Sequence, residues 1–310
     1  MSNVPRFMSL LLIVASLAPP PVQAQALRDR VERAREASRQ PALRAPELPP
    51  GTRVLPDLAY GPDPRQRFDA YLPGRPLAAA PAIVFVHGGG WANGNKDNPG
   101  VIEAKAAKWL PEGIALVSTN YRMLPDTAPL EQARDVARAL AEVQRRAPQW
   151  GVDPARIVLM GHSAGAHLAA LVGASPELWR QAGALPPLGV VSLDSGALDV
   201  PDMMRRPRLP PLYHRAFGAD PADWIAASPQ HQLDAGGRPM LLVCSTRRND
   251  ACPQAEAFQA AGARLGVPMQ VLREDLSHGQ VNHELGLPSD YTAAVDRWLD
   301  AVLEAAGERP

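Results

Sequence analysis

The chain has 310 residues, of which 46% are hydrophobic, and its 32 basic and 32 acidic side chains cancel to a formal net charge of zero. This length and composition suit one large domain with a core of its own. The balanced charge, with no run of Lys or Arg, argues against nucleic acid as a partner.

The first 26 residues predict a signal peptide. Arg6 supplies a positive charge, residues 8–18 form an apolar run, and small residues offer cleavage after Ala24 or after Ala26. The apolar run is too short to cross a bilayer, and no later run is long enough. We therefore expect an exported protein, periplasmic or secreted, with no stable membrane span.

Residues 27–50 predict a leader in front of the main domain. Residues 27–40 are highly charged with a helical pattern, which is typical of an exposed helix or a mobile arm; a helix that docks on a partner is the alternative. Four prolines then indicate a linker: Pro41, Pro46, Pro49 and Pro50. The main domain is expected over residues 51–310.

Strands and helices alternate from residue 52 onward, which predicts an α/β fold with a mostly parallel sheet covered by helices on both faces. Strands are expected at 52–60, 66–72, 83–86, 114–119, 157–160, 188–193, 240–244 and 269–273. Helices are expected at 100–110, 130–146, 254–265 and 292–306.

Residues 199–238 interrupt this alternation with a segment rich in Pro, Arg and Met. An insertion between two strands of such a sheet lies over its carboxyl edge, where ligands bind. It is therefore predicted to form a lid or a substrate wall, with plain surface loops and helices as the alternative. The side chains expected to line the substrate pocket are Trp91, His162, Tyr213, Phe217 and Trp224.

The most informative motif is Gly-His-Ser-Ala-Gly at residues 161–165. A β-branched strand precedes it and the helix-forming stretch 166–171 follows it, which is the strand–turn–helix context of a nucleophile elbow. Glycines are needed there because the turn is tight and the neighbouring backbone comes close. Ser163 is therefore the predicted nucleophile.

A second motif, His-Gly-Gly-Gly-Trp at residues 87–91, follows the apolar strand that ends at Val86. Successive glycines after a buried strand allow backbone N–H groups to turn toward one point, as an oxyanion hole requires. The expected donors are the N–H groups of Gly89, Gly90 and Ala164. His87 is expected to anchor the loop by hydrogen bonds.

A serine hydroxyl needs a base, and the base needs an orienting carboxylate. His278 lies in the loop after the last predicted strand, and His283 is the alternative base. Asp250 lies in the loop after strand 240–244 and is the predicted acid, with Asp194, after the preceding strand, as the alternative. The chain order of serine, acid and histidine fits either acid.

Cys244 and Cys252 are the only two cysteines. In an exported protein an even pair predicts a disulfide, with two independent thiols as the alternative. Neither H-E-x-x-H nor C-x-x-C occurs, so no metal and no other cofactor is expected.

These motifs resemble those of the α/β-hydrolase superfamily, and more narrowly the H-G-G-G esterase/lipase group, which includes BD-FAE-like carboxylesterases and kynurenine formamidase relatives. The resemblance extends over residues 52–305. It rests on Ala59-Tyr60-Gly61, residues 87–91 with Gly94 and Lys96, Asn120-Tyr121-Arg122, residues 161–168, Asp250 and His278.

The resemblance implies the α/β-hydrolase fold and hydrolysis of carboxylic esters of small or aromatic substrates through an acyl-enzyme. An arylformamidase or related amidase is the alternative, and a non-catalytic binding protein on the same fold is a remote one. Formamidases of this group often carry H-G-G-x-W where this chain has H-G-G-G-W, which favours the carboxylesterase. The small-molecule ester is the one partner expected, and the sequence leaves the oligomeric state open.

Overall fold

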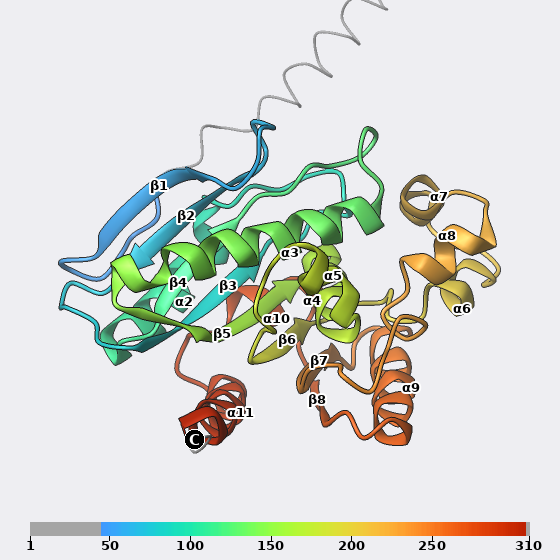
Figure 1. Ribbon diagram of the computed structural model, residues 1–310. Coiled ribbons are helices and arrows are strands. Elements are labelled where there is room, and N and C mark those ends of the chain that lie inside the picture. Colours follow the sequence, from blue (N-terminus) through green and yellow to red (C-terminus); the bar gives the residue numbers. More distant parts are fainter. Residues whose placement is uncertain (1–44, 308–310) are drawn as a thin grey trace, which may run out of the picture. The chain divides into compact units, whose positions relative to one another are not determined.

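Eight strands form one sheet, as the alternating pattern predicts (Figure 1). The computed structural model describes residues 45–307, so the expected signal peptide and the charged stretch 27–40 lie outside the described residues. The strand order is β1-β2-β4-β3-β5-β6-β7-β8. The strands are β1 (Arg53–Ala59), β2 (Arg67–Leu72), β3 (Ala80–Val86), β4 (Ala115–Thr119), β5 (Val152–His162), β6 (Gly189–Leu193), β7 (Met240–Ser245) and β8 (Met269–Glu274).

The sheet is antiparallel at one side and parallel over the rest. β1 pairs with β2 and β2 with β4 in antiparallel register, whereas all pairs from β4–β3 to β7–β8 are parallel. The parallel strands therefore bring their carboxyl ends to one edge. The two segments predicted to carry the serine and the histidine follow β5 and β8, so both begin at this edge.

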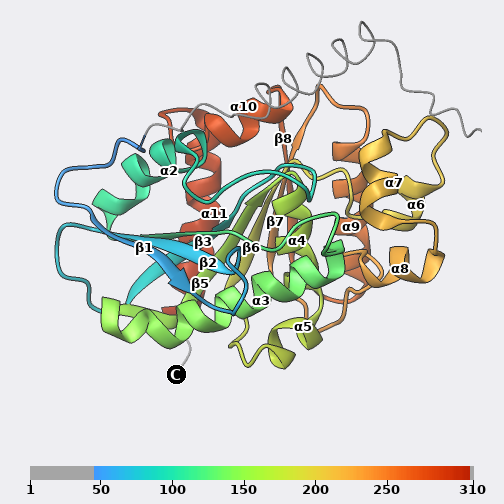
Figure 2. The same ribbon diagram turned by 90° about the horizontal axis from the view of Figure 1, so that it is seen from above.

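Helices cover both faces of the sheet (Figure 2). Successive strand residues point to opposite faces, and in β3 Val84 and Val86 enter one core cluster while Ile83 and Phe85 enter the other. The first cluster is covered by α3 (Pro129–Arg146), α4 (Ala164–Ala174) and α9 (Ala251–Arg264). The second is covered by α2 (Pro99–Glu112) and α11 (Asp290–Gly307).

The helix α3 shows why these segments fold as they do. Pro129 occupies its first turn, where a missing N–H costs nothing, and Arg145 and Arg146 lie in its last turn beside the negative end of the helix dipole. Val136 and Leu140, one turn apart, are fully buried against the sheet.

The insertion at 199–238 folds into three short helices that lie together at one end of the sheet (Figure 1, yellow). They are α6 (Val200–Met204), α7 (Pro211–Phe217) and α8 (Pro221–Ala226). The sequence patterns did not predict two other short helices, α5 (Pro176–Gln181) and α10 (His278–His283). Over residues 45–307, none of the helices combines the length and the apolar character needed to span a bilayer.

Candidate active site

Ser163 occupies the predicted elbow between β5 and α4, with φ 57° and ψ −118°. A Cβ atom on Gly161 would lie 2.3 Å from the Gly165 carbonyl oxygen, and one on Gly165 would lie 2.1 Å from the Val86 oxygen, so only glycine fits either position. The Ser163 N–H donates to the Leu193 carbonyl at 2.9 Å. The elbow is thereby fixed against the last residue of β6.

The glycine loop after β3 lies against this elbow. Gly89 and Gly90 have φ values of 125° and 60°, and a Cβ atom on Gly88 would come 3.1 Å from the Ser163 Cβ. Within residues 45–307, the backbone N–H groups of Gly89 and Gly90 have no hydrogen-bond acceptor. Together with the first N–H of α4, on Ala164, they are available to an oxygen atom beside the serine.

His87 holds the base of this loop. Its Nδ1 lies 2.8 Å from the Gly88 oxygen and its Nε2 lies 3.1 Å from Asn120 Oδ1. Burial lowers the pKa of His87 to about 4, so the ring is neutral at ordinary pH. The anchoring contacts expected from the sequence are present.

His278, the first residue of α10, lies beside the serine. Its Nε2 is 2.9 Å from Ser163 Oγ, so the hydroxyl can donate to it. Its Nδ1 donates to Asp194 Oδ2 at 2.6 Å. Serine, imidazole and carboxylate therefore form one chain of hydrogen bonds.

The predicted acid, Asp250, is wrong as the partner of His278; the carboxylate at Nδ1 is that of the alternative, Asp194. Asp194 directly follows β6, the strand next to β5, and its side chain is fully buried with φ 58°. Asp250 precedes α9 and turns its carboxylate to Arg248, with contacts of 3.0 Å and 2.8 Å. Both aspartates follow parallel strands that end at the same edge of the sheet, so the direction in which each side chain turns decides between the two.

Several donors hold the Asp194 carboxylate. Oδ1 accepts from the Ser245 N–H at 2.8 Å, and Oδ2 accepts from Arg248 Nη1 at 3.0 Å. Burial alone would raise the pKa of Asp194, but the hydrogen bond from His278 and the charge of Arg248 together hold it below its ordinary value. The group is therefore ionised at neutral pH.

Arg248 was not identified from the sequence. It bridges Asp194 and Asp250, and its Nη1 also lies 2.9 Å from His278 Nδ1. Burial would lower its pKa, but the charges of Asp194 and Asp250 raise it above the ordinary value, so it is permanently charged. The only signal in the sequence was its position two residues before Asp250, which does not indicate where the side chain points.

The helix α10 is fixed near both ends. His162 Nε2 lies 2.8 Å from the His278 carbonyl oxygen, and burial lowers the His162 pKa to about 3. Lys105 on α2 donates to the carbonyl and to the side-chain oxygen of Asn282, at 2.7 Å and 3.0 Å. These contacts fix α10 and therefore help to position the imidazole of His278, its first residue.

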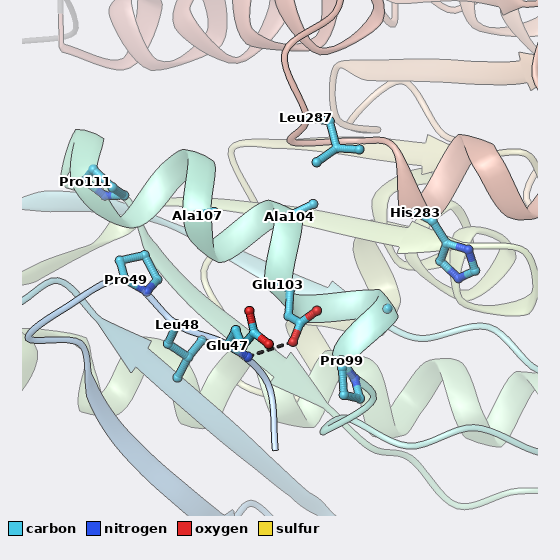
Figure 3. A pocket seen from close by; sticks show the side chains of 11 residues that line it. Glu47, Leu48, Pro49, Pro99, Glu103, Ala104, Ala107, Pro111, His283 and Leu287 are labelled. Carbon is cyan, nitrogen blue, oxygen red and sulfur yellow. Dashed lines mark hydrogen bonds between the residues drawn. The ribbon is translucent and has the colours of Figure 1, made fainter. Parts of the chain in front are cut away.

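His283 does not reach the serine. It lines a different cavity, with Pro99, Glu103 and Leu287 among its neighbours, on the outer side of α2 and α10 (Figure 3). Of the two histidines considered as the base, the structure brings only His278 to Ser163.

A cavity of about 470 Å³ opens in front of Ser163. Of the predicted pocket residues, Trp91 and Tyr213 line it, whereas His162, Phe217 and Trp224 do not. The His162 ring is hydrogen-bonded to the backbone carbonyl of His278 on α10. Phe217 is buried edge-on against Trp91, with ring centroids 5.0 Å apart. The Trp224 indole, on α8, donates to the carbonyl of Gly218 at the end of α7, at 3.2 Å. The insertion does form one wall of the cavity, through residues 206–213.

Cys244 and Cys252 form the predicted disulfide, with their Cα atoms 5.1 Å apart. The bond closes the segment that joins β7 to α9 and carries both Arg248 and Asp250. No group of three or more His, Cys, Asp or Glu side chains suited to a metal ion occurs within the part of the chain that the structure describes.

Sequence comparison places these features among esterases and related hydrolases. Residues 68–184 match the BD-FAE family model. The chain is 35% identical over 117 residues to a protein of Oryza sativa subsp. japonica named as a probable isoprenylcysteine alpha-carbonyl methylesterase, covering 38% of this chain and 28% of that one. It is 30% identical over 149 residues to the kynurenine formamidase of Danio rerio, covering 48% of each. The chain thus spans about a quarter to a half of the length of these relatives.

Structural comparison extends the likeness to nearly the whole chain. Esterase B from Lactobacillus rhamnosis matches with a TM-score of 0.66 at 21% identity, over 92% of this chain and 96% of the other. At this identity the likeness establishes the fold. The chain has the α/β-hydrolase fold, and the part of it that matches the BD-FAE family model is residues 68–184.

Proposed function

We propose that the protein is a serine esterase that cleaves carboxylic esters through an acyl-enzyme. The observation that carries the proposal is the hydrogen-bonded chain Ser163–His278–Asp194, which stands beside a glycine loop with unused N–H groups. A serine hydroxyl becomes a nucleophile when a positioned base can take its proton, and the anion that follows needs donors in place beforehand.

In the proposed reaction His278 Nε2 takes the hydroxyl proton as Ser163 Oγ attacks the ester carbonyl. Asp194 keeps the imidazole in the tautomer with its proton on Nδ1 and stabilises the imidazolium that forms. The N–H groups of Gly89, Gly90 and Ala164 stabilise the oxyanion. His278 then gives its proton to the leaving alcohol, and a water molecule repeats the sequence to release the acid.

The second candidate is hydrolysis of an N-formyl aromatic amide with the same residues. The resemblance of the chain to a kynurenine formamidase favours it, whereas the third glycine of the loop favours the ester. An ester and its matched formamide, assayed side by side on purified protein, separate the two: higher kcat/KM for a p-nitrophenyl ester supports the esterase.

We also propose that the protein is exported after cleavage near Ala24 or Ala26. The apolar leader with its small residues supports this, and so does the Cys244–Cys252 disulfide, because such bonds persist in oxidising compartments. The mass of the mature protein recovered from an expressing cell's periplasm or medium tests it.

Ser163→Ala tests the proposed chemistry. It should abolish ester hydrolysis and labelling by a fluorophosphonate probe, since the nucleophile is lost, while the melting temperature stays within a few degrees. Ser195→Ala is the matched control, because Ser195 lines the same cavity and its hydroxyl accepts from the Ala197 N–H instead of from a member of the proposed triad. Retained turnover in Ser163→Ala contradicts the proposal.

A further inference from the structure

The wall of the cavity in front of Ser163 has an excess of positive charge. Three arginines and one aspartate line it: Arg206, Arg208, Arg248 and Asp250. The whole chain carries no net charge, so this concentration is a local feature rather than a consequence of composition.

The three arginines differ in how their charge is used. Arg248 is neutralised by Asp194 and Asp250, which hold it from two sides. Arg206, half-buried, pairs at 2.5 Å with Asp202, a residue that does not line the cavity. Arg208 is exposed, and among residues 45–307 it has no ion-pair partner.

The backbone at Arg208 adds a second observation. Its φ is 63°, in the left-handed region that favours glycine and that costs other residues about 1 kcal/mol. The exposed Arg208 lines the cavity at its rim, next to Leu209 and Pro210. Residues strained in this way cluster at binding and active sites.

Tyr213 connects this rim with the reacting groups. It lines the cavity, and its phenol interacts electrostatically with Asp250, Arg248 and Arg206. A ligand lying on Tyr213 therefore has the guanidinium groups of Arg248 and Arg206 within electrostatic reach. A guanidinium binds a carboxylate better than any other side chain, through parallel N–H donors.

We propose that the preferred substrates are esters that carry a carboxylate, which Arg208 and Arg206 bind at the rim of the cavity while the ester carbonyl lies at Ser163. This rests on the proposed esterase function. The carboxylate can belong to the acyl part or to the alcohol part of the ester, and the test distinguishes them.

The test compares acidic esters with neutral esters in which a methyl group replaces the carboxylate. For the acyl part the pair is mono-p-nitrophenyl glutarate and p-nitrophenyl pentanoate; for the alcohol part it is the butyrates of 4-hydroxybenzoic acid and of 4-methylphenol. At low ionic strength kcat/KM should favour the acidic ester in at least one pair. Added salt should reduce this preference, because exposed charges are screened.

The variants locate the preference. Arg208→Gln and Arg206→Gln should each lower the ratio of kcat/KM for the acidic ester to that for the neutral ester about two- to fivefold, the range of an exposed ion pair. Arg205→Gln is the matched control, since Arg205 is exposed beside them but does not line the cavity. Equal losses in Arg205→Gln, or a preference for the neutral ester in both pairs, overturn the proposal.

A binding measurement keeps the two proposals separate. If the neutral esters are hydrolysed and the acidic esters are not preferred, only the rim assignment is contradicted. If neither the acidic nor the neutral esters are hydrolysed, the esterase function is contradicted. In that second case calorimetry with Ser163→Ala still decides the rim assignment: tighter, salt-sensitive binding of the acidic ester supports it, and equal binding overturns it.

Discussion

The two sides of the candidate active site are built differently. On the side of the nucleophile, backbone geometry does the positioning. The elbow at Ser163 depends on close approaches at Gly161 and Gly165, and the glycine loop depends on a close approach at Gly89 and on a positive φ at Gly90. On the side of the base, side chains hold one another, in a network that joins His278, Asp194 and Arg248. The nucleophile side consists of two short segments of contiguous residues. The side of the base is assembled from residues that follow three different strands, β6, β7 and β8.

This difference between the two sides indicates which parts of the site tolerate the loss of a residue. A glycine in a tight turn has no substitute, because a Cβ atom would meet backbone at little more than 2 Å. The acid–base network contains a second carboxylate and a bridging guanidinium, so the loss of one member has graded effects. The four predictions below test this contrast on the side-chain network.

The largest effect is expected at the base. His278→Ala should lower kcat by about five to six orders of magnitude, as removal of a catalytic histidine does elsewhere. His283→Ala is the matched control on the same helix and should lose less than about threefold, since it faces the outer cavity. Steady-state kinetics on the two variants checks this, and equal losses would remove His278 from the role of base.

The second effect separates the two carboxylates. Asp194→Asn should lower kcat about 10⁴-fold, because the imidazole loses the acceptor that fixes its tautomer. Asp250→Asn should lose about tenfold or less, since the Asp250 carboxylate contacts Arg248 and not His278. A larger loss in Asp250→Asn than in Asp194→Asn would restore Asp250 as the acid.

This pair of carboxylates also shows what the sequence could predict. The strands, the covering helices, the elbow and the glycine loop were all correct, because each depends on residues next to one another in the chain. The partner of His278 depends on the directions in which the side chains of Asp194 and Asp250 turn after β6 and β7. Neither is encoded in local spacing.

The same reasoning explains the pocket. Trp91 was identified because it adjoins the glycine loop, whereas the directions of Phe217 and Trp224 depend on how the short helices of the insertion pack. Arg248 was missed because a charged residue in a loop is usually solvated, and its burial follows from two carboxylates that meet it in space.

The third prediction concerns the disulfide. Reduction, or Cys252→Ser, should lower kcat about tenfold or more, because the closed segment places Arg248 against Asp194 and small displacements of a catalytic group are costly. The stability lost should be about 2–3 kcal/mol at most, since the closed loop is short. Kinetics and thermal melting with and without reductant check this. Full activity after reduction, or two free thiols by mass spectrometry, would contradict it.

The smallest effect on rate, and a clear one on stability, is expected at Lys105, the anchor of α10. Burial lowers its pKa from the ordinary 10.5 to about 7. Between these values the unfolded chain keeps the proton that the folded protein has released, so the free energy of unfolding rises with pH, by up to about 1.4 kcal/mol per unit. This contribution to the free energy of unfolding is fully present above about pH 10.5 and is lost as the pH falls to about 7.

Lys105→Met removes the titrating amino group and keeps an apolar side chain of similar length. The stability of wild type relative to Lys105→Met should therefore increase as pH rises from 7 to 10, measured by urea unfolding at a series of pH values. The nearby His162 and His283 have pKa values lowered by burial, so they titrate below this window. A difference that stays constant across the window would show that Lys105 keeps its charge, held there by the two oxygens of Asn282, and that α10 is anchored by a buried cation at every pH at which the protein is folded.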